Sequence, residues 1–146
     1  MNKEDVVGKI NYDDIHFPKE DAENALFESF VTFEHSKRLK ELGFQLLNPR
    51  FFYNEFGDFS GFRIGMSSSL PHPYYQAPTL AQACKWLRCK DILIHILPKS
   101  NNKYMTQVWE ISSYDILETL RGEFDSYEQA QSAGIDVALG LLEKGA

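Results

Sequence analysis

The sequence predicts an α+β fold, in which helices pack on antiparallel β-strands. Capping residues and apolar residues at helical spacing mark the helices, and short aromatic and β-branched runs between turn formers mark the strands. The composition is typical of a folded protein, since 43% of the 146 residues are hydrophobic and the aromatic residues number 11 Phe, 7 Tyr and 2 Trp. A chain of this length can bury a sizeable core as one compact unit.

The first 28 residues form an acidic arm. They contain eight acids and three bases, a net charge of −5, whereas the whole chain carries −6. We expect this arm to be loosely ordered, with a short helix at about residues 20–27. The acidic balance disfavours a nucleic-acid partner, because binding a phosphate backbone requires a cluster of Lys and Arg.

Residues 29–66 are predicted to form a helix followed by an aromatic hairpin. Thr32 is the expected N-cap of the helix, and Gly43 is the expected left-handed residue after its end. The predicted contact face of this helix comprises Phe33, the stem of Lys37, Leu39 and Leu42. Two aromatic strands then flank Gly57-Asp58, which predicts a two-stranded hairpin with a bulge at Ser60-Gly61.

Residues 67–78 are predicted to link this first subdomain to a second one at residues 79–146. The stretch SSSLPHPYYQAP holds three of the six prolines of the chain and a run of serines, a composition typical of turns. The second subdomain reads as helix, strand, strand, a third segment that is either strand or helical turn, and helix. We expect the two subdomains to pack together as one unit.

Each element of the second subdomain has its own sequence signal. Thr79 and Gln82 predict a capping box for a helix at 80–89, the strands follow at 91–97 and 103–112, and residues 114–120 are ambiguous. Ser126 and Gln129 predict a capping box for the final helix. Its expected contact face comprises Ala130, Ala133, Val137 and Leu141, and Gly134 and Gly140 predict close packing of this helix against the sheet.

Both cysteines of the chain lie on the helix predicted at 80–89. At about 100° per residue, Cys84 shares an apolar stripe with Leu80, Ala83 and Leu87, whereas Cys89 lies about 140° away from Cys84. The two thiols therefore point apart and cannot form a disulfide or bind a metal together on an intact helix. We interpret Cys84 as a small core residue and predict no metal site and no cofactor.

The sequence leaves three hypotheses about function open, and the least favoured of them is a catalytic role for a histidine. Ser67, Ser68 and Ser69 lie near His72, but they lack the pattern of a nucleophile elbow. His95 shares a strand face with Leu93 and Leu97, where a histidine is usually structural. The chain lacks the phosphate-loop, dinucleotide and HExxH motifs, so we assign no catalytic residue and keep His72 or His95 as an acid or base only as an alternative.

The second hypothesis is nucleic-acid binding by the polar side of the helix predicted at 80–89. An aromatic ring among basic residues can stack on a base while the cations contact phosphates. The residues that would do so are Lys85, Trp86, Arg88 and Lys90, with Lys99 and Lys103 as additional cations.

The preferred hypothesis is a non-enzymatic protein-interaction module. The block RFFYNEFGDFSGF carries more aromatic residues than one face of a two-stranded hairpin can bury, so some of them should contact a partner protein or a second copy of the chain. The predicted partner-binding residues are Phe51, Tyr53, Phe56, Phe59 and Phe62. No apolar run is long enough to span a bilayer and the N-terminus does not read as a secretion signal, so we expect no membrane contact and a cytoplasmic location.

Several motifs across residues 30–143 resemble those of a family of small uncharacterised bacterial and phage-borne proteins. The motifs are LKELGF at 39–44, Ala77-Pro78, Trp86-Leu87-Arg88 and Tyr127-Glu128 followed by Ala130. The resemblance implies a shared fold and a phage or mobile-element setting, and it implies no activity. The second half is also topologically similar to double-stranded RNA-binding domains, although Asp125 and Glu128 stand where those domains place phosphate-binding lysines.

Overall fold

The computed structural model describes residues 29–47, 49–61 and 74–145, and it confirms the α+β fold. In this part of the chain, helices α3 (Phe33–Glu41), α4 (Leu80–Cys89) and α5 (Tyr127–Gly145) accompany two antiparallel sheets. The larger sheet has the order β4-β5-β6, with β4 at Ile92–Lys99, β5 at Lys103–Glu110 and β6 at Asp115–Phe124. The smaller sheet has the order β2-β1-β3, with β1 at Phe51–Tyr53, β2 at Phe59–Gly61 and β3 at Tyr75–Gln76.

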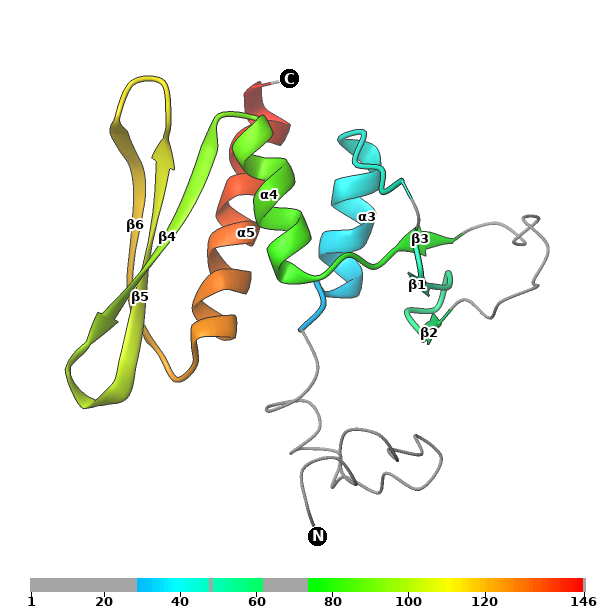
Figure 1. The fold of residues 1–146 in the computed structure, drawn as a ribbon, viewed down its shortest axis with the longest axis horizontal. Coiled ribbons are helices and arrows are strands. Elements are labelled where there is room, and N and C mark those ends of the chain that lie inside the picture. The colour runs from blue at the N-terminus through cyan, green and yellow to red at the C-terminus, as the bar shows by residue number, and fades with distance from the viewer. Residues whose placement is uncertain (1–28, 48, 62–73, 146) are drawn as a thin grey trace, which may run out of the picture.

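The elements form layers along the longest axis of the molecule. Figure 1 shows α4 and α5 on one face of the larger sheet, with α3 beyond them and the smaller sheet at the opposite end. Helix α5 contacts β4, β5, α4 and α3, so it is the central element of the packing. No helix in the described residues is long and apolar enough to cross a membrane.

Helix α3 has the predicted ends, and its predicted contact face is confirmed in part. The backbone N–H of His35 donates to Thr32 Oγ1 at 3.1 Å, and Gly43 has φ +91°. The buried residues are His35, Ser36 and Leu39, whereas Phe33, Lys37 and Leu42 are only partly buried. The predicted face was incomplete because it counted apolar side chains only: Leu39 is buried and Leu42 packs against the core, but two polar side chains of this helix are buried as well.

The aromatic hairpin is confirmed, without the predicted bulge. Phe51 pairs with Gly61, Phe52 with Ser60 and Tyr53 with Phe59 in an unbroken register. Asn54 closes the turn, since its Oδ1 accepts from the N–H groups of Phe56 and Asp58 at 2.8 and 2.9 Å. On its other edge β1 pairs with β3, so the end of the segment predicted as a linker adds a strand to this sheet.

The second subdomain follows the predicted order, and the ambiguous segment is a strand. Helix α4 begins with the Thr79–Gln82 capping box and buries Leu80, Ala83, Cys84 and Leu87, as predicted. Residues 100–102 form a short 3-10 turn between β4 and β5. Most of the segment at 114–120 belongs to β6, which pairs with β5 through two register shifts.

Helix α5 packs on more than one side, which explains why its predicted face was incomplete. Ser126 Oγ accepts from the N–H of Gln129 as expected, whereas the side chain of Gln129 accepts from the N–H of Asp125. The buried residues are Ala130, Gly134, Ile135, Ala138 and Leu139, while Ala133, Val137 and Leu141 are partly buried. A single stripe does not describe a helix that lies between a sheet and two other helices.

The two glycines of α5 have different surroundings. A Cβ on Gly134 would lie 2.6 Å from Ile94 Cγ2 and 2.8 Å from Thr106 Cγ2, so the predicted close packing against the sheet is confirmed there. A Cβ on Gly140 would meet only Arg38 Nη2, at 3.7 Å, so the same prediction was wrong for Gly140.

Candidate functional site

Three phenylalanines form a compact cluster on one face of the smaller sheet. The ring centroids of Phe30 lie 4.8 Å from Phe51 and 4.9 Å from Phe59, and the rings of Phe51 and Phe59 stack at 5.5 Å with 8° between their planes. We call Phe30, Phe51 and Phe59 the phenylalanine cluster. Phe51 is 37% exposed and Phe59 is 45% exposed, so the cluster presents apolar surface even though its rings contact one another.

Local pairing explains why these rings lie together. Opposed residues of antiparallel strands point to the same face, so Tyr53, Phe59 and Tyr75 share a face, and Phe51 joins them by alternation along β1. Phe30 reaches that face because it forms an isolated bridge with Thr79 beside α4. The sequence could not reveal this contribution, since the bridge joins residues that are far apart along the chain.

The predicted partner-binding residues have different roles. Phe51 and Phe59 belong to the cluster, and Phe56 is 79% exposed in the hairpin turn. Tyr53 is half-buried and its hydroxyl donates to the Val31 carbonyl at 2.6 Å, while burial raises the pKa of that hydroxyl. Tyr53 therefore holds the hairpin against the chain before α3. Phe62 lies outside the described residues.

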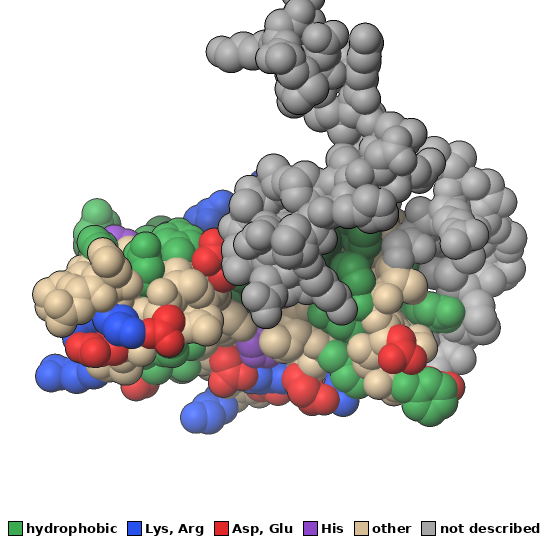
Figure 2. Space-filling model, turned by 90° about the horizontal axis from the view of Figure 1, so that it is seen from below, with side chains coloured by type: hydrophobic (Ala, Val, Ile, Leu, Met, Phe, Trp, Pro, Cys, Tyr) green, Lys and Arg blue, Asp and Glu red, His purple; other side chains and the backbone are tan. Residues whose placement is uncertain are grey.

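Polar residues accompany the cluster along the hairpin. Arg50 before β1 and Glu55 and Asp58 in the turn are exposed. In Figure 2 hydrophobic side chains gather at the end of the molecule that carries the smaller sheet, with acidic side chains among them. Exposed aromatic residues with polar neighbours are typical of protein–protein contact surfaces.

A network of charged side chains joins α3 to α5. His35 Nε2 lies 3.1 Å from Asp136 Oδ1, and Arg38 Nη1 donates to the same oxygen at 2.7 Å. Arg38 also pairs with Glu143. Burial would raise the pKa of Asp136, but the hydrogen bonds from His35 and Arg38 outweigh it and hold this pKa below its ordinary value. Sequence reasoning missed this network, which fixes the two helices relative to each other.

His95 lies on the exposed face of the larger sheet, at a shallow cavity of about 280 Å³. Its ring is 6.4 Å from that of Trp109, which in turn contacts Tyr114 edge-on at 6.0 Å. Within the described residues the His95 ring makes no hydrogen bond that would orient it as an acid or base. His72, the other histidine of the enzyme hypothesis, lies outside the described residues.

The basic residues and Trp86 on the polar side of α4, on which the nucleic-acid hypothesis rests, are only partly available to a ligand. Lys85, Arg88 and Lys90 are exposed, whereas Trp86 is half-buried against Phe44 at 5.6 Å, with Lys90 Nζ 5.3 Å from its ring centroid. A stacking base would have to displace Lys90 from that ring. The additional cations have acidic partners, since Lys99 pairs with Glu123 and Lys103 with Asp125.

The cysteines lie as the sequence predicts. Cys84 is buried and accepts a hydrogen bond from Gln131 Nε2 at 3.4 Å, and burial raises the pKa of its thiol. Cys89 is exposed. In the described part of the chain, no group of three or more His, Cys, Asp or Glu residues is arranged to hold a metal ion.

Comparison with protein-family models, with curated proteins and with solved structures found no match for this chain. The resemblance to small phage-borne proteins therefore stays a prediction. The phenylalanine cluster is the surface from which a function can be argued.

Proposed function

We propose that this chain is a non-enzymatic protein-interaction module and that the phenylalanine cluster is its contact surface. The observation that carries the proposal is the stacking of Phe51 on Phe59 while both remain more than a third exposed. A cluster that served only the fold would bury these rings more completely, because each exposed aromatic ring forgoes hydrophobic free energy. The resemblance described above suggests the setting, an accessory protein of a phage or mobile element in the cytoplasm.

The exposed area is enough to matter for binding. An aromatic side chain can bury about 150–250 Å², so the exposed fractions of Phe51 and Phe59 correspond to about 160 Å² of apolar surface. At about 25 cal/mol per Å², covering this surface contributes about 4 kcal/mol. That is the size of a central hot spot in a protein interface, where a few aromatic residues dominate the affinity.

The preorganisation of the rings also supports the proposal. Phe30 and Tyr53 contact the exposed rings from the side, and Tyr53 is itself held by its hydrogen bond to Val31. Side chains that are already packed lose little rotamer freedom when a partner covers them, which lowers the entropic cost of binding.

The experiment compares the wild type with a Phe51→Ser/Phe59→Ser double variant. Native mass spectrometry and sedimentation equilibrium measure self-association, and affinity capture from the native host at gentle salt measures binding to other proteins. We expect one stoichiometric complex with the wild type and loss of that complex with the double variant. The matched control is Tyr127→Ser, since Tyr127 is 47% exposed but lies at the start of α5, away from the hairpin.

Folding of the variants is checked by far-UV circular dichroism and thermal unfolding. The proposal fails if the wild type forms no complex in either assay. It also fails if the folded double variant keeps the same complexes as the wild type, or if Tyr127→Ser abolishes them equally.

A further inference from the structure

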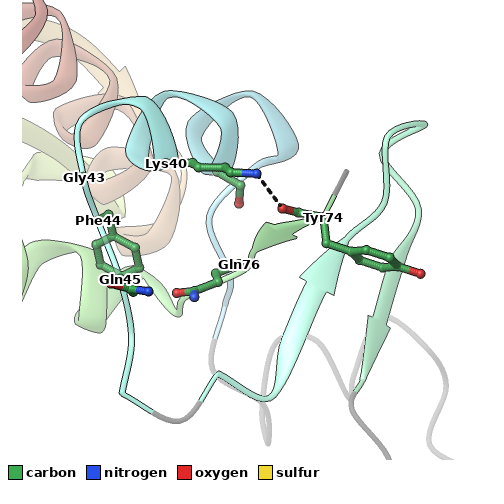
Figure 3. Close-up of a pocket in the computed structure, with 7 residues that line it drawn as sticks. Lys40, Gly43, Phe44, Gln45, Tyr74 and Gln76 are labelled. Atoms are coloured by element: carbon green, nitrogen blue, oxygen red, sulfur yellow. Dashed lines mark hydrogen bonds between the residues drawn. The ribbon is translucent and has the colours of Figure 1, made fainter. Parts of the chain in front are cut away.

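A second cavity lies between the end of α3 and β3, away from the phenylalanine cluster. It has a volume of about 280 Å³ and is lined by Ser36, Lys40, Gly43, Phe44, Gln45, Tyr74 and Gln76. Figure 3 shows the amino group of Lys40 directed toward the backbone carbonyl of Tyr74, whose ring points away from Lys40, and the side chain of Gln76 directed toward Gln45. Helix α3, the turn after it and β3 together build this cavity.

Ser36 is the most informative residue of the lining. Its side chain is almost fully buried, at 1% exposure for the residue, and its hydroxyl has no hydrogen-bond partner among the described residues. A buried hydroxyl without a partner costs free energy, so native structures rarely keep one without a reason. A ligand in the cavity that Ser36 lines would supply the missing partner.

Lys40 and Gln76 also bring donor groups to the lining. Lys40 Nζ donates to the Tyr74 carbonyl at 3.2 Å and lies 4.9 Å from the ring centroid of Tyr75, which holds its charge at the edge of the cavity. Gln76 Oε1 accepts from the N–H of Leu46 at 2.8 Å, so its orientation is fixed. Its amide nitrogen makes no hydrogen bond within the described residues and remains able to donate.

The charge of the lining has one sign. Lys40 is its only ionised residue, and no acid lines the cavity among the described residues. The end of a helix carries partial negative charge, but here the carbonyls of Leu39 and Lys40 already accept from the N–H groups of Phe44 and Gly43. The site is therefore suited to an acceptor with negative charge.

We propose that this cavity binds a small carboxylate with an apolar body of about one ring. The carboxylate would accept from Lys40, Ser36 and Gln76, and the apolar body would lie against the Phe44 ring. The size agrees with this class of ligand, because an apolar cavity of about 150 Å³ holds benzene and small-molecule sites begin near 300 Å³. The site is independent of the phenylalanine cluster, since Gln76 pairs with Phe52 on the opposite face of the smaller sheet from Phe51 and Phe59.

The test is a titration of the isotopically labelled full chain followed by the amide resonances of Gly43, Phe44 and Gln76. The probes are benzoate and hexanoate, with benzyl alcohol and benzylamine as neutral and cationic counterparts. We expect saturable shifts with at least one carboxylate, about tenfold weaker binding of the alcohol, and no binding of the amine, because hydrogen bonds to charged groups are the stronger ones.

Two variants on α3 form a matched pair. Lys40→Met should weaken carboxylate binding about tenfold or more, whereas Lys37→Met should leave it unchanged, since Lys37 lies over Phe33 and pairs with Glu34 outside the cavity. Ser36→Ala should weaken binding about three- to tenfold without lowering the melting temperature of the ligand-free protein. Absence of saturable shifts with both carboxylates would overturn the proposal, as would equal effects of Lys37→Met and Lys40→Met.

Discussion

Gly134 allows α5 to approach the larger sheet, and replacing it with alanine should destabilise the fold despite a gain in helix propensity. Alanine is favoured over glycine inside a helix by about 1 kcal/mol. The new Cβ would lie under 3.0 Å from the γ-methyl groups of both Ile94 and Thr106. Overpacking of this kind typically costs about 1–3 kcal/mol of folding free energy. Because Thr106 is fully buried, we expect a cost at the upper end of that range.

Thr106 cannot easily rotate away, because its hydroxyl donates to the Ala130 carbonyl at 2.7 Å. We therefore expect Gly134→Ala to lower the free energy of unfolding by about 2 kcal/mol. Gly140→Ala is the matched control on the same helix. Its Cβ has ordinary contact distances, so this variant should raise the free energy of unfolding by about 0.5–1 kcal/mol.

Urea denaturation monitored by circular dichroism measures both variants. A third variant isolates the cause, since Thr106→Ser removes the γ-methyl group and keeps the hydroxyl. The double variant Gly134→Ala/Thr106→Ser should be less destabilised than the sum of its single changes, which a double-mutant cycle detects. If Gly134→Ala stabilises the protein as much as Gly140→Ala does, the close approach of α5 to the sheet is refuted.

Three further predictions concern stability and reactivity. The pKa of Asp136 lies below its ordinary value of 3.8, so its contribution to stability is present above that pH and is lost as pH falls through the folded-state pKa. Because the Asp136 side chain is 62% exposed, screening limits this contribution to about 1 kcal/mol or less, and Asp136→Asn should remove it from an acid-denaturation profile. Thr79→Ala breaks the capping box of α4 and should lower the free energy of unfolding by about 1 kcal/mol; an unchanged urea midpoint would contradict this. A thiol reagent should modify exposed Cys89 in the native protein and reach buried Cys84 only after denaturation, so rapid loss of both thiols would count against the described packing of α4.

The sequence predicted the elements whose signals are local. Thr79 and Gln82 lie three residues apart and satisfy each other within one turn, so the start of α4 follows from the sequence alone. The apolar stripe of α4 was also correct, because this helix buries a single face against the core. The same holds for the hairpin, whose turn is closed by Asn54 and Asp58 within five residues.

The remaining features depend on contacts between distant residues. The burial of His35 and Ser36 was not expected, because it follows from the packing of α3 against α5 and β3, which are distant in the sequence. Phe30 reached the phenylalanine cluster through a bridge to Thr79, which no spacing rule predicts. The excess of aromatic residues in the hairpin was visible in the sequence, but the stacking of Phe51 on Phe59 depends on the strand register.

The most direct test of the central claim is photo-crosslinking from the position of Phe59. A benzophenone-bearing amino acid replaces Phe59 in the full chain, and in a second protein it replaces Tyr127, which has a similar exposed fraction. Both proteins are irradiated in the native host, and the adducts are identified by mass spectrometry. If the phenylalanine cluster is a contact surface, position 59 gives one predominant adduct, either to a second copy or to a single partner, and position 127 does not. An absence of adducts at position 59, or the same adducts from both positions, would contradict the proposed function.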